Sequence, residues 1–216
     1  MKRPFSILIS VCFIFLLASS TAFAVGFGAF IDVSGGSGEA EWASDYDSWD
    51  IDSSSFSGGF VFDTSPTNRS PFNYRLNVGV SSQKLQDDAG IDLKSTGIYI
   101  ENIFGFAIVK NENFRWWIGP LVRVGYYSGK TDTIQYGYYS FKTEVDYAEF
   151  GIGAVTGINF KAGNVIISPS VGLRFTGFYG NGDTKYRDIY GTHSDEDDID
   201  GYTTTAFANL AVLIDL

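Results

Sequence analysis

The chain has 216 residues, of which 44% are hydrophobic, 17% aromatic and 19% charged. This apolar and aromatic composition excludes an intrinsically disordered chain, and the length suits a single domain. The formal net charge of −10 argues against a nucleic-acid-binding protein, because such proteins carry basic patches.

Residues 1–24 have the pattern of a secretory signal peptide. Lys2 and Arg3 supply a positive start, residues 7–18 are all apolar or small, and the Ala-Phe-Ala of residues 22–24 fits a cleavage site. The apolar run is shorter than the roughly 20 residues that a membrane-spanning helix needs. We therefore expect an exported protein from which this segment is removed.

The remaining domain, residues 25–216, shows a two-residue alternation of apolar with polar or small residues. In residues 72–81 every second residue is Phe, Tyr, Leu or Val, and Asn, Arg, Gly or Ser stand between them. This period is typical of β-strands with one apolar and one polar face. The eight predicted strands are residues 25–34, 56–63, 72–81, 96–109, 115–127, 148–160, 166–180 and 203–216.

The connections between these strands alternate between long and short, so all the long ones fall at one end of an antiparallel arrangement. The long ones are residues 35–55, 82–95, 128–144 and 181–202, and the short ones are residues 64–71, 110–113 and 161–164. An even number of strands with this alternation is typical of an outer-membrane barrel. We predict an all-β fold, an eight-stranded antiparallel up-and-down transmembrane β-barrel.

Aromatic residues support a membrane barrel over a soluble one. Phe72 and Trp116 lie near the short-turn end of their strands, and Tyr126 and Tyr179 lie near the long-connection end. Aromatic side chains collect at both borders of a bilayer. The alternative, a soluble sandwich or lipocalin-like barrel, would need another layer to cover the apolar outward faces.

The last predicted strand carries the closest likeness to a known family. Apolar residues occupy every second position up to the last residue of the chain: Ala206, Ala208, Leu210, Val212, Ile214 and Leu216. Over residues 25–216 the chain resembles the small eight-stranded outer-membrane barrels of the OmpA and OmpX type in Gram-negative bacteria, which usually end in Phe. The resemblance implies contact with outer-membrane lipid and lipopolysaccharide, and insertion by the barrel-insertion machinery. We expect a monomer without a cofactor or nucleic acid.

The polar faces of the predicted strands should fill the lumen. A barrel of eight strands is only wide enough to be packed with side chains. Opposite charges confined there should pair, since an unpaired buried charge is costly. The predicted network consists of Arg75, Glu101, Arg115, Arg123, Glu149 and Arg174, with Asp32 and Asp63 near the ends of their strands. The alternative is that these charges line a narrow channel for small solutes.

Pro120 and Pro169 fall inside predicted strands. Proline cannot donate a hydrogen bond to a neighbouring strand. We therefore expect β-bulges or local widening at both positions, or a register displaced by one residue.

The sequence offers no clear catalytic constellation. His193, the only histidine, adjoins Ser194, and residues adjacent in sequence do not easily adopt the facing geometry of a nucleophile and its base. We expect a protein that is not an enzyme. A lipid A-modifying enzyme remains the third alternative.

Acidic residues concentrate in two of the long connections, residues 35–55 and 181–202. Glu196, Asp198 and Asp200 resemble the first half of a calcium loop, but Phe207 stands where the closing Glu belongs. Weak Ca²⁺ or Mg²⁺ binding and simple solvation of the acids both remain open. We expect a structural or surface-recognition role through acidic extracellular loops, with a porin-like channel as the alternative.

Overall fold

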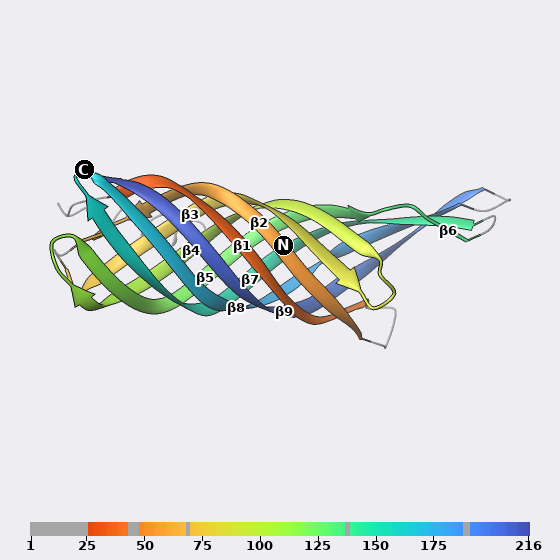
Figure 1. The fold of residues 1–216 in the computed structure, drawn as a ribbon. Coiled ribbons are helices and arrows are strands. Elements are labelled where there is room, and N and C mark those ends of the chain that lie inside the picture. The colour runs from red at the N-terminus through yellow and green to blue at the C-terminus, as the bar shows by residue number, and fades with distance from the viewer. Residues whose placement is uncertain (1–25, 43–47, 68–69, 137–138, 188–190) are drawn as a thin grey trace, which may run out of the picture.

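The computed structural model describes residues 26–42, 48–67, 70–136, 139–187 and 191–216 (Figure 1). The predicted signal peptide lies outside the described residues. The strands are β1 (Gly26–Trp42), β2 (Trp49–Asp63), β3 (Phe72–Asp87), β4 (Asp92–Lys110), β5 (Phe114–Thr131), β6 (Ile134–Tyr136), β7 (Tyr139–Ala162), β8 (Val165–Arg187) and β9 (Thr192–Asp215). Among the described residues, no helix is long and apolar enough to cross a membrane.

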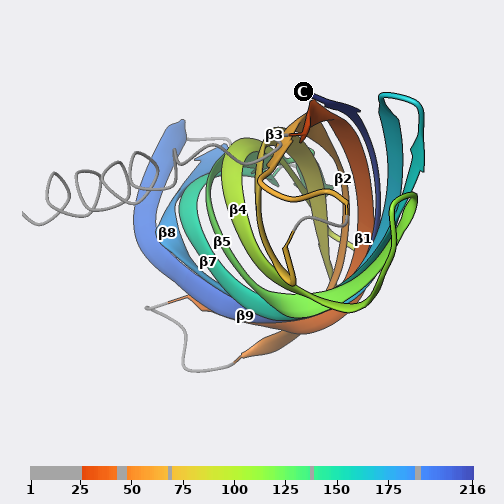
Figure 2. The same cartoon turned by 90° about the vertical axis from the view of Figure 1, so that its left-hand side faces the viewer.

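The strands form one closed antiparallel ring, which confirms the predicted fold class. Consecutive strands pair with each other except β5 and β6; β5 pairs directly with β7, and β1 pairs with β9 to close the ring (Figure 2). The short strand β6 adds only to the far end of β7, so the ring itself has eight strands. Closure satisfies the backbone hydrogen bonds of both edge strands, as a structure that spans a membrane requires.

A continuous apolar band surrounds the outside of the ring. Phe72 and Trp116 at the short-turn border and Tyr126 and Tyr179 at the opposite border all point outward, as predicted. We call this surface the apolar band; its exposed side chains include Ile31, Val33, Phe56, Phe60, Val78, Val80, Ile98, Ile100, Ile118, Val124, Phe150, Ile152, Val171, Leu173, Leu210 and Val212.

The strands continue far beyond the apolar band, so the prediction of four long loops is wrong. Most of residues 35–55, 82–95, 128–144 and 181–202 belong to strands. The part of the ring beyond the band, which we call the distal barrel, keeps the alternation but reverses its polarity. Outward residues there are charged, and inward ones such as Ala40 and Ile51 are apolar and buried. The outer face of the distal barrel therefore suits contact with water rather than with lipid.

Neither proline introduces a β-bulge or a displaced register, but the pairing is interrupted for two residues beside each one, between β4 and β5 at Pro120 and between β7 and β8 at Pro169. Ile103 opposite Leu121 and Phe106 opposite Ile118 keep one register on both sides of Pro120. The register across Pro169 is likewise unchanged. The β-bulge of β4 and β5 lies instead between Ala107 and Val109.

Strands β6 to β9 extend past the other hairpins as a narrow sheet, at the right of Figure 1. Strand β1 ends at Trp42 opposite Ile199, so within the described part of the chain residues 192–198 of β9 pair only with β8. This open edge carries the acidic run of residues 195–198. Charged side chains on an exposed edge discourage pairing with another chain, which gives this run a structural role.

Candidate functional site: the lumen of the barrel

The six charged residues predicted to face the lumen all do so. Each has at most 6% of its surface exposed, and Asp32 and Asp63 are equally buried. They form two separate clusters rather than one network. The basal cluster lies near the short turns, and the central cluster lies at mid-height of the apolar band.

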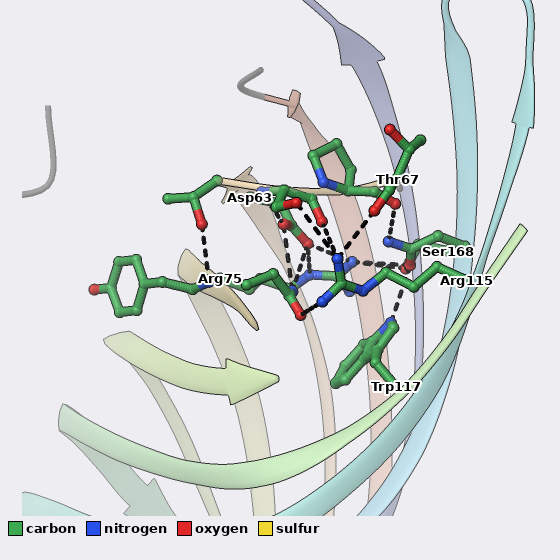
Figure 3. A network of polar contacts seen from close by, with 12 residues as sticks. Asp63, Thr67, Arg75, Arg115, Trp117 and Ser168 are labelled. Carbon is green, nitrogen blue, oxygen red and sulfur yellow. Dashed lines mark hydrogen bonds and ion pairs between the residues drawn. The ribbon is translucent and has the colours of Figure 1, made fainter. Parts of the chain in front are cut away.

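The basal cluster is built around Asp63 and Arg75 (Figure 3). Nε of Arg75 donates a hydrogen bond to Oδ2 of Asp63 at 3.0 Å, and its Nη2 donates to Oγ of Ser168 at 2.8 Å. The Arg75 guanidinium lies 4.9 Å from the ring centroid of Trp117, whose Nε1 donates to Oδ1 of Asn159. The cluster therefore joins side chains from β2, β3, β5, β7 and β8.

Arg115 anchors the connection between β2 and β3 inside the barrel. Its Nη1 donates to the main-chain oxygens of Ser65, Thr67 and Ser70, and its Nη2 donates to that of Pro71, at 2.9 to 3.1 Å. Ser65 and Thr67 are buried, and Figure 2 shows this orange connection lying across the opening of the ring. The prediction treated it only as a short turn, because sequence alone does not indicate which way a turn folds.

The central cluster links five strands, β1, β4, β5, β7 and β8, through two arginines. Arg174 donates from Nη1 and Nη2 to the carboxylate of Asp32 and from Nε to Oε2 of Glu101 at 2.8 Å. Arg123 donates from Nε to Oε1 of Glu149 at 3.0 Å, and its Nη1 lies 4.0 Å from Oε2 of Glu101. Glu101 therefore connects the two arginines.

Aromatic rings cover both arginines of this cluster. The guanidinium of Arg123 lies 3.6 Å from the ring centroid of Tyr99, and that of Arg174 lies 3.7 Å from the ring centroid of Phe207. A cation held over an aromatic face is stabilised electrostatically. The rings also occupy the space between the charges, so little of the lumen is open at this height.

A cavity of about 20 Å³ lies beside Arg123, among hydroxyl groups that include those of Ser81 and Thr205. Nη1 of Arg123 has no hydrogen-bond partner among the described residues. A polar cavity of this size can hold a single water molecule.

The distal barrel encloses a second and larger cavity, of about 440 Å³, with a different lining. Ile51, Leu85, Val145, Phe178 and Ile199 form its wall, together with Trp42 and Trp49. On the side of the central cluster, Tyr127 and Tyr147 belong to the same group of packed residues and stack with ring centroids 5.3 Å apart. The lumen therefore changes from polar in the band to apolar beyond it.

The sequence patterns did not lead us to expect this cavity. A signal was present, because apolar residues stand at alternate positions in Ala40-Glu41-Trp42 and in Trp49-Asp50-Ile51. These short alternations lay inside segments interpreted as acidic loops. Their inward sides become apparent only when the strands are extended.

Glu196, Asp198 and Asp200 do not form a calcium loop. They lie at alternate positions of β9, so they are about 6.6 Å apart along one face of an extended strand. Asp198 instead accepts hydrogen bonds from the hydroxyl of Tyr179 and the amide of Asn181. Across the described residues, no three His, Cys, Asp or Glu side chains are grouped so that they could hold a metal ion.

Ion pairs on the outer face of the distal barrel join β7 and β8. Glu144 accepts hydrogen bonds from Nζ of Lys142 at 2.7 Å and from Nζ of Lys185 at 2.9 Å. These bonds lower the pKa of Glu144 to about 2. The same interaction raises the pKa of Lys185.

No model of a known protein family matches the sequence, and no curated protein matches it. Several solved structures are similar in fold. A major outer-membrane protein from Thermus thermophilus is 10% identical, with a TM-score of 0.45, over 89% of this chain and 99% of that one. Neisserial surface protein A (NspA) is 12% identical, with a TM-score of 0.36, over 88% and 97%. The outer membrane protease OmpT from Escherichia coli is 8% identical, with a TM-score of 0.37, over 92% and 99%. At these values the similarity assigns no activity to this chain.

Proposed function

We propose that the chain is a non-enzymatic, integral outer-membrane barrel protein of the small eight-stranded kind, and that its distal barrel recognises molecules outside the cell. The observation that carries the proposal is the apolar band on a closed ring whose lumen is filled with paired charges. Exposed apolar patches of soluble monomers rarely exceed a few hundred Å². An apolar surface that runs around the whole ring, across every strand, suits contact with lipid.

Polar side chains within the band also fit this placement. Asn102 accepts a hydrogen bond from the hydroxyl of Tyr74, and Thr156 accepts one from Nε1 of Trp116. In hydrocarbon an unsatisfied polar group costs several kcal/mol. These local partners reduce that cost without water.

The proposal also covers export, the orientation of the barrel with its distal part outside the cell, and the oligomeric state. Residues 1–24 are removed on export, so N-terminal sequencing of the mature protein should begin at Val25. The charged outer face of the distal barrel lies at the level of lipopolysaccharide headgroups, and the barrel-insertion machinery acts on the C-terminal strand. The expected state in the membrane is a monomer.

Two geometric features support the absence of catalysis. His193 lies exposed on β9 opposite Tyr186, and Ser194 points to the other face of the same strand. The two side chains therefore diverge. Incubation with lipid A followed by mass analysis tests this part, and a deacylated or otherwise modified product would overturn it.

The second candidate function is a narrow channel, which the cavity beside Arg123 favours. Planar-bilayer recording separates the two. We expect no conductance steps from the unmodified protein. The double variant Arg123→Ala and Arg174→Ala should conduct, whereas Arg187→Ala, at the exposed end of β8, should not. Steady conductance of the unmodified protein would establish the channel instead.

A further inference from the structure

The cavity in the distal barrel has the size and lining of a small-molecule site. Its volume of about 440 Å³ lies within the roughly 300–1,000 Å³ of known ligand pockets. Most of its wall is aliphatic or aromatic. A water molecule needs about two to four polar partners to be well held, and a mostly apolar wall offers few. An apolar occupant suits such a wall better than water does.

We propose that this cavity binds a small apolar molecule that is neutral or cationic and that enters from outside the cell. This inference rests on the proposed function, because it needs the distal barrel to face outward. It adds the chemical class of the ligand to that function.

The charge around the cavity selects against anions. Residues 35–55 contain six acidic residues and no Lys or Arg. They include the distal ends of β1 and β2, which contribute Trp42 and Ile51 to the wall. Asp87 also lines the cavity. Clustered charges of one sign lower the local concentration of ions of the same sign. Fatty acids and phosphorylated lipids should therefore bind poorly.

Two tryptophans provide an aromatic surface for the ligand. The rings of Trp42 and Trp49 stack with their centroids 6.2 Å apart, and both line the cavity. Trp42 extends across to β8, where a side chain at Gly182 would lie 2.5 Å from its ring. Such rings favour flat apolar molecules and attract cations to their faces.

The experiment uses the processed protein in phosphatidylcholine nanodiscs and two matched probes. N-phenyl-1-naphthylamine is neutral, and 1-anilinonaphthalene-8-sulfonate adds one negative charge to the same framework. Saturable energy transfer from tryptophan, corrected with empty nanodiscs, reports binding. We expect the neutral probe to bind at one site and the anionic probe to bind at least about tenfold more weakly.

Two variants on β1 locate the binding site. Ala40→Phe adds a ring inside the cavity and should weaken binding of the neutral probe by about tenfold or more. Ala29→Phe makes the same change on the exposed face of that strand and should leave binding unchanged. If Ala40→Phe does not fold, Leu85→Gln places a polar group in the wall and should weaken binding similarly.

The outcomes distinguish this inference from the proposed function. Equal affinity for both probes, or unchanged binding by the folded cavity variant, would overturn the inference. A protein that enters nanodiscs with β-sheet circular dichroism but binds neither probe contradicts only the inference. A processed chain that stays soluble and folded without lipid or detergent contradicts the proposed function.

Discussion

Arg174 and Asp32 form a bidentate ion pair across the lumen. Nη1 and Nη2 of the arginine donate to Oδ1 and Oδ2 of the aspartate at 3.1 and 2.9 Å. The two residues belong to β8 and β1, which are separated in the ring by β9. The pair therefore fastens strands that do not hydrogen-bond to each other.

Asp32→Ala should destabilise the barrel strongly. It leaves the buried Arg174 guanidinium with Glu101 as its remaining carboxylate partner. Breaking a buried ion pair from one side typically costs about 3–5 kcal/mol, and we expect a loss of that size in the free energy of unfolding. Urea unfolding from lipid bilayers measures it. Asp52→Ala, on the outer face of β2, should change stability by less than about 0.5 kcal/mol, and equal effects of both variants would contradict the role of the pair.

Arg115→Ala should loosen the connection between β2 and β3. Four main-chain oxygens of this connection lose their donor. Hydrogen exchange of residues 64–71 should become faster, and Arg115→Lys should show most of the effect because an ammonium lacks the planar fork of a guanidinium. Lys110 is exposed at the short-turn end of the barrel, so Lys110→Ala serves as the control. Unchanged exchange in Arg115→Ala would show that the strands alone hold the connection in place.

The ring and its inward charges could be predicted because both depend only on the two-residue period. Once Arg75, Glu101 and Arg123 lie on the polar side of their strands, closure of the ring forces them inward. The ion-pair partners of these charges could not be predicted in the same way. Arg174 forms ion pairs with Asp32 and Glu101 inside the lumen. Which charged residues pair depends on the tilt and stagger of the strands, and no local sequence pattern encodes these.

The distal barrel was missed because its strands reverse their polarity. The outward acids at positions 39, 41, 50 and 52 resemble a solvated loop when they are considered alone. Their inward neighbours Ala40 and Ile51 are buried in the wall of the cavity. Because the outer face of these strand ends is polar, their apolar residues lie inward, as Val145 of β7 and Ile199 of β9 also do.

Gly157→Ala should disturb the packing around Trp117. A methyl group at this position would lie 2.5 Å from the indole ring and 2.8 Å from Cβ of Ser170. Trp117 is fully buried, so it has little room to move, and overpacking typically costs about 1–3 kcal/mol. Thermal unfolding in detergent should show the loss. Gly177→Ala, whose methyl group would meet only a carbonyl oxygen at 3.9 Å, should have a much smaller effect, and the reverse order would contradict the close fit at Trp117.

Acid should release the ion pairs between β7 and β8 only at very low pH. Lys142 and Lys185 hold the pKa of Glu144 near 2, below its ordinary value of 4.5. Since the pKa in the folded protein is depressed, the stabilisation is complete above pH 4.5 and is lost as the pH falls toward 2. The carboxyl carbon shift of Glu144, followed by NMR, should therefore titrate near pH 2. In Lys185→Ala the midpoint should move upward toward 4.5, and in Lys110→Ala it should stay in place. A midpoint near 4.5 in the unmodified protein would show that these exposed pairs do not persist in solution, where salt and side-chain entropy oppose them.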